Sequence, residues 1–457
     1  MPQGTKPILF KSVNRLLSVS LLALALIHAA SAQERPDLAD SVKQEFLHAW
    51  NGYKHYAWGH DELLPLSKKP RDWYGTSLCM TPVDAFDTMM LMGLSEEANE
   101  AKQLIIDSLS FNKNIEVQAF EIIIRELGGL LSAYQLSGDK RLLSLAEDLG
   151  KRLLPIYNSR TGMPYRYVNL VTGRIRDSIN NPAEIGTALI EFGTLSKLTG
   201  DPVYYAKAKN ALVQLFQRRS TIGLVGTWIN VETGEWVDTS SHISGAIDSY
   251  YEYLLKSWLL FGDEDCRTMW DESILAINKY LADRTSHNLW YGHANMGSGV
   301  RTETAFGSLD AFFPAVLALS GDLQRAAALE GSCYKMWNLY GIEPEEIDYA
   351  SMKVVDARYF LRPEIIESAY YLRHFTGDPK YVDMGKTFFR GIERYCRTDD
   401  GYAYLKDVTT KEQGDEMPSF FFAETLKYLY LLFAPDNTLP FDKVIFNTEA
   451  HPIRRSF

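Results

Sequence analysis

Apolar positions along the chain recur with helical spacing, and short turns containing glycine interrupt them at regular intervals. Around one such turn, apolar residues are dense over 122–136 and recur at steps of three and four over 142–154. Gly-Asp pairs mark five turns, at Gly138, Gly200, Gly262, Gly321 and Gly377. Glycine commonly ends a helix, and aspartate is a good N-cap for the next one. The pattern therefore predicts a repeated helical hairpin of about 60 residues.

Two weaker turns extend the repeat to seven units, at Gly93 and at 433–436. Seven hairpins can stack as an open solenoid or close into a ring. A solenoid needs polar capping repeats at its ends, and none is evident. We therefore predict an all-α fold for residues 33–457, an (α/α)7 barrel of seven inner and seven outer helices. Stretches 163–175 and 225–237 resemble β-hairpins inserted on one face, and 441–451 is expected to be extended.

The first 32 residues have the character of a signal peptide. An uncharged, apolar run covers 16–27, and Ala-Ser-Ala at 30–32 provides the small residues of a cleavage site. Twelve residues are too few to span a bilayer, which needs about 20. We predict that 1–32 is cleaved and that the mature chain is exported, periplasmic or secreted, without a membrane span. The basic residues at its start are Lys6, Lys11 and Arg15.

Charge and cysteine content limit the partners of the mature chain. Loss of three basic residues moves the formal net charge from −11 to −14. An acidic surface argues against nucleic acid or anionic lipid, and suits a neutral substrate and a bound cation. We expect a monomer. The four cysteines can pair in three ways or remain as buried thiols; they are Cys79, Cys266, Cys333 and Cys396.

Acidic residues precede six of the seven turns by 6 to 17 positions, at the expected start of an inner helix. One acid in a first helical turn is usually a cap. These acids, however, lie among apolar and aromatic residues, and burial of several acids favours a shared site at one end of the barrel. The fifth hairpin has Ser308 and Asp310 instead. The eight acids are Asp84, Asp87, Glu121, Glu184, Asp248, Glu364, Glu367 and Glu424.

Several carboxylates with aromatic neighbours indicate cleavage of glycosidic bonds, in which one acid protonates the leaving oxygen and another activates water or attacks the sugar. The Gly-x-Ser-x-Gly, His-Glu-x-x-His and phosphate-loop motifs of other hydrolases are absent from the sequence.

Five segments resemble the class I α-mannosidases, glycoside hydrolase family 47, in order over residues 41–452. They are FEIIIRELGGLLSAY (120–134), DSYYEYLLK (248–256), LRPEIIES (361–368), SFFFAETLKY (419–428) and FNTEAHP (446–452). The resemblance implies a calcium-dependent, inverting exo-α-1,2-mannosidase that trims mannose-rich glycans. It also implies the seven-hairpin barrel, with the C-terminal segment closing the far side.

The resemblance assigns roles to individual residues. Glu121 is the expected general acid, acting through a water, Glu364 the general base, and Asp248 the third essential carboxylate. Which of Glu121 and Asp248 delivers the proton stays open. Thr448 is the expected Ca²⁺ ligand, through its hydroxyl and carbonyl oxygens. The residues expected to contact mannose are Arg125, Glu184, Arg362, Glu367, Phe420 and Glu424.

Three positions depart from the family pattern. Ala246 replaces an arginine of the branch-selective enzymes, which puts single-branch selectivity in doubt. Ser308 replaces the usual histidine, and its segment resembles the branch of ER-degradation-enhancing mannosidase-like proteins. Cys333 has Ala311 at its usual partner position, so that disulfide cannot form. The alternatives are a non-catalytic or weakly active mannose-glycan-binding protein of the degradation-enhancing type, and a different (α/α)-barrel glycosidase.

Overall fold

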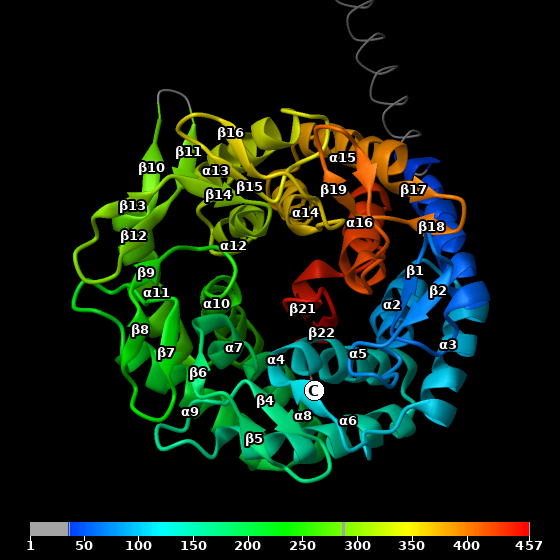
Figure 1. The fold of residues 1–457 in the computed structure, drawn as a ribbon, viewed down its shortest axis with the longest axis horizontal. Coiled ribbons are helices and arrows are strands. Elements are labelled where there is room, and N and C mark those ends of the chain that lie inside the picture. Colours follow the sequence, from blue (N-terminus) through cyan, green and yellow to red (C-terminus); the bar gives the residue numbers. More distant parts are fainter. Residues whose placement is uncertain (1–34, 36, 286–287, 457) are drawn as a thin grey trace, which may run out of the picture.

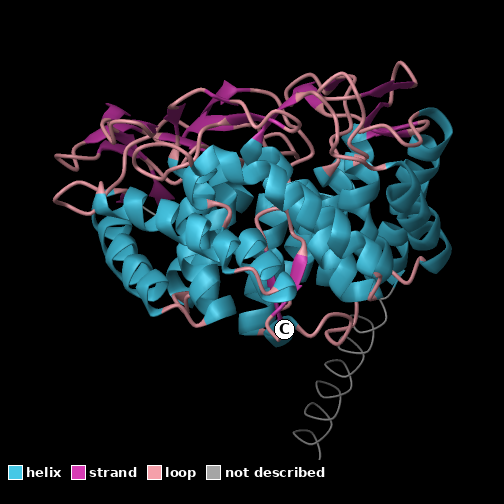
Figure 2. Cartoon of the chain, turned by 90° about the horizontal axis from the view of Figure 1, so that it is seen from below, coloured by secondary structure: helices cyan, strands magenta, loops and turns pink. Residues whose placement is uncertain are grey.

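The computed structural model describes residues 35, 37–285 and 288–456. The predicted signal peptide lies outside these residues. Helices form two concentric rings, and short strands gather at one end of them (Figures 1 and 2). Each inner helix contacts the next, and contacts between η4 and α2 close the ring. The predicted (α/α)7 barrel is therefore confirmed.

The inner ring begins each repeat and the outer ring completes it. The inner segments are α2 (Met80–Leu91), α4 (Ala119–Ile122) with η1 (Ile123–Leu127) and α5 (Gly128–Ser137), α7 (Pro182–Gly186) with α8 (Leu189–Thr199), α10 (Asp248–Phe261), η3 (Leu309–Phe312) with α12 (Phe313–Leu319), α14 (Glu364–Thr376), and η4 (Phe421–Thr425) with α16 (Leu426–Phe433). The outer helices include α3 (Ser95–Ser108), α6 (Lys140–Leu153), α9 (Pro202–Gln217), α11 (Glu264–Tyr280), α13 (Leu323–Trp337) and α15 (Lys380–Cys396). A short turn of helix, η2 (Leu154–Tyr157), follows α6.

The glycine turns behave as the sequence predicts. Gly138 ends α5 with φ of 73°, in the left-handed region that glycine adopts without strain. Asp139 then caps α6 by accepting a hydrogen bond of 3.1 Å from the backbone N–H of Arg141. Asp201, Asp263 and Asp322 cap the following outer helices in the same way. The repeat thus arises from one local signal used several times.

The seventh outer helix comes from the opposite end of the chain. Residues 37–56 are helical and pack on the seventh inner segment. The rings of Phe46 and Trp50 lie 5.2 Å and 5.9 Å from that of Phe422. Arg35 donates a hydrogen bond of 2.9 Å to the carbonyl of Ala434, just after α16. The last turn therefore needs no helix after it, because the N-terminal helix already fills that place.

Small antiparallel sheets cover the end of the barrel where the inner helices begin (Figure 2). The predicted stretches 163–175 and 225–237 do form hairpins, each joined by a third strand. The sheets are β1 (Glu62–Leu64) and β2 (Lys69–Arg71); β3 (Glu116–Gln118), β4 (Tyr167–Asn169) and β5 (Ile175–Arg176); β6 (Ile179–Asn180), β7 (Trp228–Asn230) and β8 (Trp236–Asp238); β9 (Ser240–Ser241), β12 (His293–Asn295) and β13 (Arg301–Glu303); β10 (Ala282–Arg284) and β11 (Leu289–Tyr291); β14 (Ala305–Gly307), β15 (Glu346–Asp348) and β16 (Lys353–Asp356); β17 (Arg397–Thr398) and β18 (Gly401–Tyr402); β19 (Leu405–Asp407) and β20 (Glu412–Gln413).

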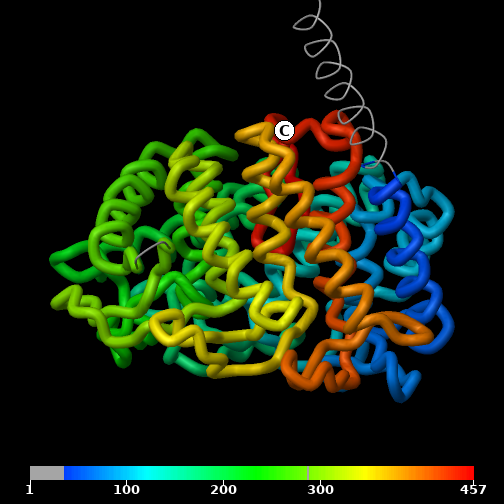
Figure 3. The backbone as a smooth tube through the Cα atoms, turned by 90° about the horizontal axis from the view of Figure 1, so that it is seen from above, coloured from blue at the N-terminus to red at the C-terminus, as the bar shows by residue number. Residues whose placement is uncertain are grey.

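The C-terminal segment enters the barrel from the side opposite these strands (Figures 2 and 3). After η5 (Phe441–Lys443) it forms a hairpin of β21 (Val444–Phe446) and β22 (Pro452–Arg454). The predicted extended segment 441–451 is thus mostly one arm and the turn of this C-terminal hairpin. The inner wall leaves little room for it, because a Cβ added at Gly128 would lie 2.5 Å from Nδ2 of Asn447.

All four cysteines are buried and unpaired. Cys333 makes no bridge, as Ala311 at the partner position requires.

Candidate active site

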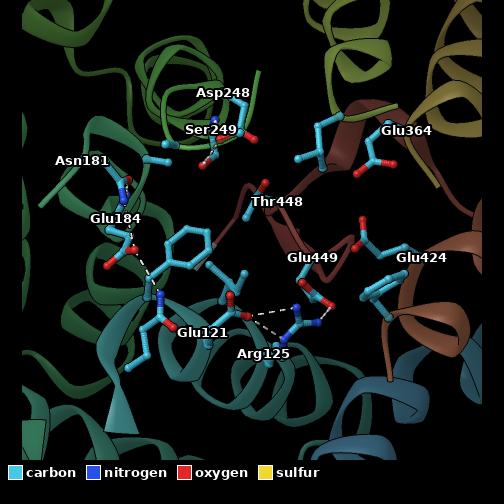
Figure 4. A pocket seen from close by; sticks show the side chains of 18 of the residues that line it. Glu121, Arg125, Asn181, Glu184, Asp248, Ser249, Glu364, Glu424, Thr448 and Glu449 are labelled. Atoms are coloured by element: carbon cyan, nitrogen blue, oxygen red, sulfur yellow. Dashed lines mark hydrogen bonds and ion pairs between the residues drawn. The ribbon is translucent and has the colours of Figure 1, made fainter. Parts of the chain in front are cut away.

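A cavity of about 370 Å³ opens among the first turns of the inner helices, and we call it the central cavity. Thr448, at the turn of the C-terminal hairpin, lines it from below (Figure 4). Of the ten residues to which the family resemblance assigns a role, nine line it: Glu121, Arg125, Glu184, Asp248, Arg362, Glu364, Phe420, Glu424 and Thr448. The tenth, Glu367, lines a smaller chamber described below. The barrel therefore brings together residues separated by more than 300 positions in the chain.

Arg125 organises one wall of the central cavity. Its guanidinium donates to Oε2 of Glu121, with Nε at 3.1 Å and Nη2 at 3.0 Å, and its Nη1 pairs with Glu449. The aromatic rings of Trp73 and Phe420 lie 5.3 Å and 5.7 Å from it. The side chain is only 8% exposed, so these contacts fix the orientation of Glu121.

Glu184 is held on the adjoining wall by three neighbours. Arg166 donates to both carboxylate oxygens, at 2.8 Å and 3.0 Å for the shortest contacts. Gln118 and Asn181 each donate to Oε1 at 3.0 Å. Asn181 also caps α7 through the backbone N–H of Glu184, so the helix start and the carboxylate are fixed together. Oε2 receives fewer donors than Oε1 and keeps capacity for a ligand hydroxyl.

Asp248 and Glu364 are the first residues of α10 and α14, and both carboxylates are desolvated. Burial raises the pKa of Asp248 to about 7 and that of Glu364 to about 8. The backbone N–H of Ser249 donates to Asp248 at 2.7 Å. Oε2 of Glu364 is buried, and no described residue donates a hydrogen bond to it. An unpartnered buried oxygen at a cavity wall is suited to binding water or a ligand.

Arg362 completes the wall beside Glu364. Glu345 accepts hydrogen bonds from its Nε and Nη2, both at 3.0 Å. The guanidinium lies 5.8 Å from the ring of Phe420, whose ring is also approached by Arg125. Phe420 therefore lies between two fixed cations, which hold its ring at the cavity wall.

A chamber of about 50 Å³ adjoins the central cavity, and we call it the lower chamber. Its polar lining consists of oxygen-bearing side chains: Asp248, Ser249, Glu252, Glu364, Glu367, Glu424 and Thr448. Burial raises the pKa of Glu367 to about 7 and that of Glu424 well above its ordinary value. Lys256 pairs with Glu252 and lies 3.8 Å from Glu367. The five carboxyl groups of the lining outnumber this one cation, and such an oxygen-rich lining suits a hard divalent cation such as Ca²⁺. In the described part of the chain, no three acidic, histidine or cysteine side chains converge closely enough to hold a metal by themselves.

The C-terminal hairpin is fixed by a buried ionic cluster, and this corrects one expectation from the sequence. Asp84 and Asp87 were expected at the shared acidic end, yet neither lines the central cavity. Asp87 instead pairs with Lys427 at 2.6 Å and with Nδ1 of His451 at 2.7 Å. Asp84 lies 3.3 Å from Nε2 of His451. These two acids are neutralised by His451 on the hairpin, and Asp87 also by Lys427 on α16, so they tie the hairpin to the inner helices.

Backbone irregularities coincide with the site. Ala246 and Leu361, shortly before α10 and α14, have φ of 75° and 63°, which is strained for residues with a side chain. Arg125 and Glu424 lie in η1 and η4, the two π-helical segments of the described chain. Such local widening of a helix is common at functional sites because it redirects side chains.

Several residues of the site were not singled out from the sequence. Gln118, Arg166 and Trp228 reach the central cavity from the strands, and Glu449 from the hairpin turn. Glu449 directly follows Thr448 in the segment FNTEAHP, so an acidic residue next to the expected metal ligand was a usable signal. The strand residues carried no such signal, because their position depends on how the inserted hairpins fold over the barrel.

Comparison with known proteins identifies the family of this chain. The sequence profile described as glycosyl hydrolase family 47 matches residues 45–455. The chain belongs to this family. A human mannosyl-oligosaccharide 1,2-alpha-mannosidase IB is 37% identical over 91% of the chain and 69% of that protein. The human ER degradation-enhancing alpha-mannosidase-like protein 2 is 38% identical, over 93% and 78%. The family thus includes relatives of both kinds at similar identity.

Solved structures agree with the family 47 assignment. The alpha-1,2-mannosidase from Trichoderma reesei matches with a TM-score of 0.85 and 30% identity, over 92% of this chain and 99% of that one. A cellobiose 2-epimerase from Spirochaeta thermophila, at 12% identity and a TM-score of 0.56, shares the fold alone. The family match therefore displaces the alternative of an unrelated (α/α)-barrel glycosidase.

None of the described helices has the length and apolar character needed to cross a membrane.

Proposed function

We propose that this family 47 chain is a calcium-dependent, inverting exo-α-1,2-mannosidase acting on mannose-rich glycans. The observation that carries the proposal is the meeting of Glu121, Asp248 and Glu364 around one closed-bottomed cavity. Glu121 and Glu364 lie on opposite walls of the cavity (Figure 4). An inverting glycosidase needs roughly 6.5–9.5 Å between these carboxyl groups.

In this mechanism Glu364 is the general base. Its unpartnered Oε2 accepts a proton from the water that attacks the anomeric carbon. The proton for the leaving oxygen comes from Glu121 or Asp248, which lie on different inner helices. Glu121 is oriented by Arg125, and Asp248, with a pKa of about 7, can carry a proton near neutral pH. Arg362 and Phe420 hold the sugar ring between these groups.

Ca²⁺ would be held by Thr448 through its hydroxyl and carbonyl oxygens. Glu252, Glu367 and Glu424 around the lower chamber would hold the waters that complete the coordination shell. When bound, the ion would accept sugar hydroxyl oxygens as ligands at the base of the cavity. An exported location rests on the predicted signal peptide at 1–32.

Incubation with α-1,2-mannobiose and with a mannose-rich glycan, before and after treatment with EDTA, tests the proposal. We expect mannose release that EDTA abolishes and added Ca²⁺ restores. Hydrolysis unaffected by EDTA would contradict the role given to Thr448 and the lower chamber.

The rival function is glycan binding with little or no catalysis, which the similarity to a degradation-enhancing mannosidase-like protein favours. It predicts calorimetric binding of the same glycan without mannose release at any Ca²⁺ concentration. Replacing Glu364 by Gln would then leave glycan binding largely unchanged.

A further inference from the structure

The residues that line the central cavity come from three levels of the barrel. Thr448 and Glu449 lie at the base, on the C-terminal hairpin. Glu121, Asp248 and Glu364 lie above them, in the first turns of inner helices. The third level is that of the strands, which lie at the end of the barrel opposite the entry of the C-terminal segment (Figure 2).

These three levels indicate where the two sugars joined by the breaking bond would lie. On the proposed function, the bond that breaks lies between the acid and the base, at the level of the first helical turns. The mannose that is released therefore occupies the cavity below that level, toward Thr448. The mannose that stays on the substrate must lie at the level of the strands.

The strand level offers contacts on one side only. Of the described strand residues, those lining the cavity are Gln118 at the end of β3 and Trp228 at the start of β7; Arg166, directly before β4, joins them. Gly245, Ala246 and Leu309, which also line the cavity, contribute no polar or aromatic group. Two further rings line the cavity, those of Phe120 on α4 and of Phe420 directly before η4. Among the described strand residues, Trp228 alone presents a large flat surface to a second sugar.

Trp228 is held in place by its neighbours. The guanidinium of Arg166 lies 5.3 Å from the centre of the indole ring. Arg166 is itself fixed by its hydrogen bonds to Glu184. An indole restrained in this way is a preorganised stacking surface, which suits the apolar C–H face of a pyranose ring.

We propose that Trp228 forms the binding platform for the mannose that remains on the substrate after cleavage, and so determines how well this chain uses oligosaccharides. The platform should matter only for substrates that carry a second sugar. It should have no part in holding the mannose that is released.

The test compares two substrates on the full mature chain. α-1,2-Mannobiose carries a second sugar, whereas α-mannosyl fluoride has only fluoride as its leaving group. Trp228→Ala should lower kcat/KM for mannobiose about 10- to 100-fold and change that for the fluoride by less than about twofold. Trp228→Phe keeps a ring and should recover part of the loss. Trp236→Ala is the matched control, because Trp236 lies on the adjacent strand β8 but does not line the cavity.

Each other outcome decides against the platform or against the enzyme. Equal losses on both substrates would show that Trp228 shapes the whole cavity, and no loss on either would place the second sugar elsewhere. Both results overturn the proposal.

If the unmodified chain hydrolyses neither substrate, the proposed function has failed, and a calorimetric measurement of sugar binding then tests the platform separately. The unmodified chain should then bind mannobiose at least about tenfold more tightly than mannose, and Trp228→Ala should remove that preference. Retention of the preference would overturn the platform as well.

Discussion

Glu364 enters the central cavity with one oxygen buried and without a donor from any described residue. This environment is expensive for a carboxylate, and burial raises its pKa to about 8. At the wall of a cavity, a bound cation or ligand can offset this cost. The same reasoning applies to Glu424 and Glu367, whose pKa values are also raised by burial.

Replacing Glu364 by Gln should lower kcat by about 10²- to 10⁴-fold while glycan binding is largely kept, since the amide keeps the shape but cannot accept the proton. In the unmodified chain kcat/KM should rise with pH through the pKa of this base. Bound Ca²⁺ would lower that pKa, so the acidic limb should lie between the ordinary 4.5 and about 8. A variant with unchanged kcat, or a limb below 4.5, would exclude Glu364 as the base.

Glu330 shows the cost of a buried acid outside the site. It lies fully buried on α13, neither oxygen has a hydrogen-bond partner among the described residues, and burial holds its pKa well above the ordinary 4.5. The folded state therefore favours the protonated form. Below the pKa of the unfolded chain this has no cost, and above it the free energy of unfolding falls as pH rises toward the folded-state pKa.

Glu330→Met should consequently stabilise the protein, and increasingly so as pH rises. The gain should grow by up to about 1.4 kcal/mol for each pH unit above roughly 5. Denaturant unfolding at several pH values measures it. Glu264→Met serves as the control, because the side chain of Glu264 is 73% exposed and should give no such slope. A gain that is flat with pH would show that Glu330 titrates normally in the fold.

Single residues differ in how far the sequence could identify them. Glu121, Asp248 and Glu364 could be identified because each lies in the first turn of an inner helix and in a segment that resembles the family. Asp84 and Asp87 follow the same positional rule, yet they pair with Lys427 and His451 instead. Position in the repeat fixes which end of the barrel an acid occupies. It does not fix which neighbour neutralises the charge.

The C-terminal hairpin is the element on which the site depends most. It carries Thr448 and Glu449 and is held by Asp84, Asp87, Lys427 and His451, all fully or almost fully buried. Burial alone would lower the pKa of His451, but Asp87 and Asp84 raise it to about 9. The hairpin is therefore clamped by charge as well as by packing. Movement of this clamp would displace the proposed Ca²⁺ ligand.

Lys427→Met should cost about 3–5 kcal/mol in the free energy of unfolding, because it leaves Asp87 buried with one cation fewer and the carbonyl of Ala450 without its donor. Ca²⁺ should also bind more weakly, since Thr448 lies on the same turn. Arg358→Ala removes an exposed ion pair with Asp356 and should cost less than about 1 kcal/mol. Equal costs for the two variants would contradict the buried clamp.

Other elements differ in how well local sequence defines them. The Gly-Asp turns were predictable because left-handed glycine and aspartate caps are local preferences. The π-helical segments η1 and η4 were not, since the residues of 123–127 and 421–425 fit an ordinary helix equally well. Packing of the barrel, and not local preference, decides their geometry.

At the scale of the whole molecule, ring closure unites the two ends of the chain. The helix over 37–56 completes the outer ring beside α16, and the terminal hairpin fills the interior. The repeat count was sufficient to predict a ring, but the partner of the last inner helix came from the other end of the chain. The repeat brings the inner helix starts to one side, and closure of the ring makes them converge on one centre, which assembles the central cavity.

The stereochemistry of hydrolysis tests the central claim most directly. Proton NMR would follow the anomeric signals during the first minutes of α-1,2-mannobiose hydrolysis with Ca²⁺ present. A base that activates water across the cavity from the acid must invert the anomeric carbon, so β-mannose should appear first and the α-anomer only by later mutarotation. Initial release of α-mannose would contradict an inverting pair of Glu121 or Asp248 with Glu364.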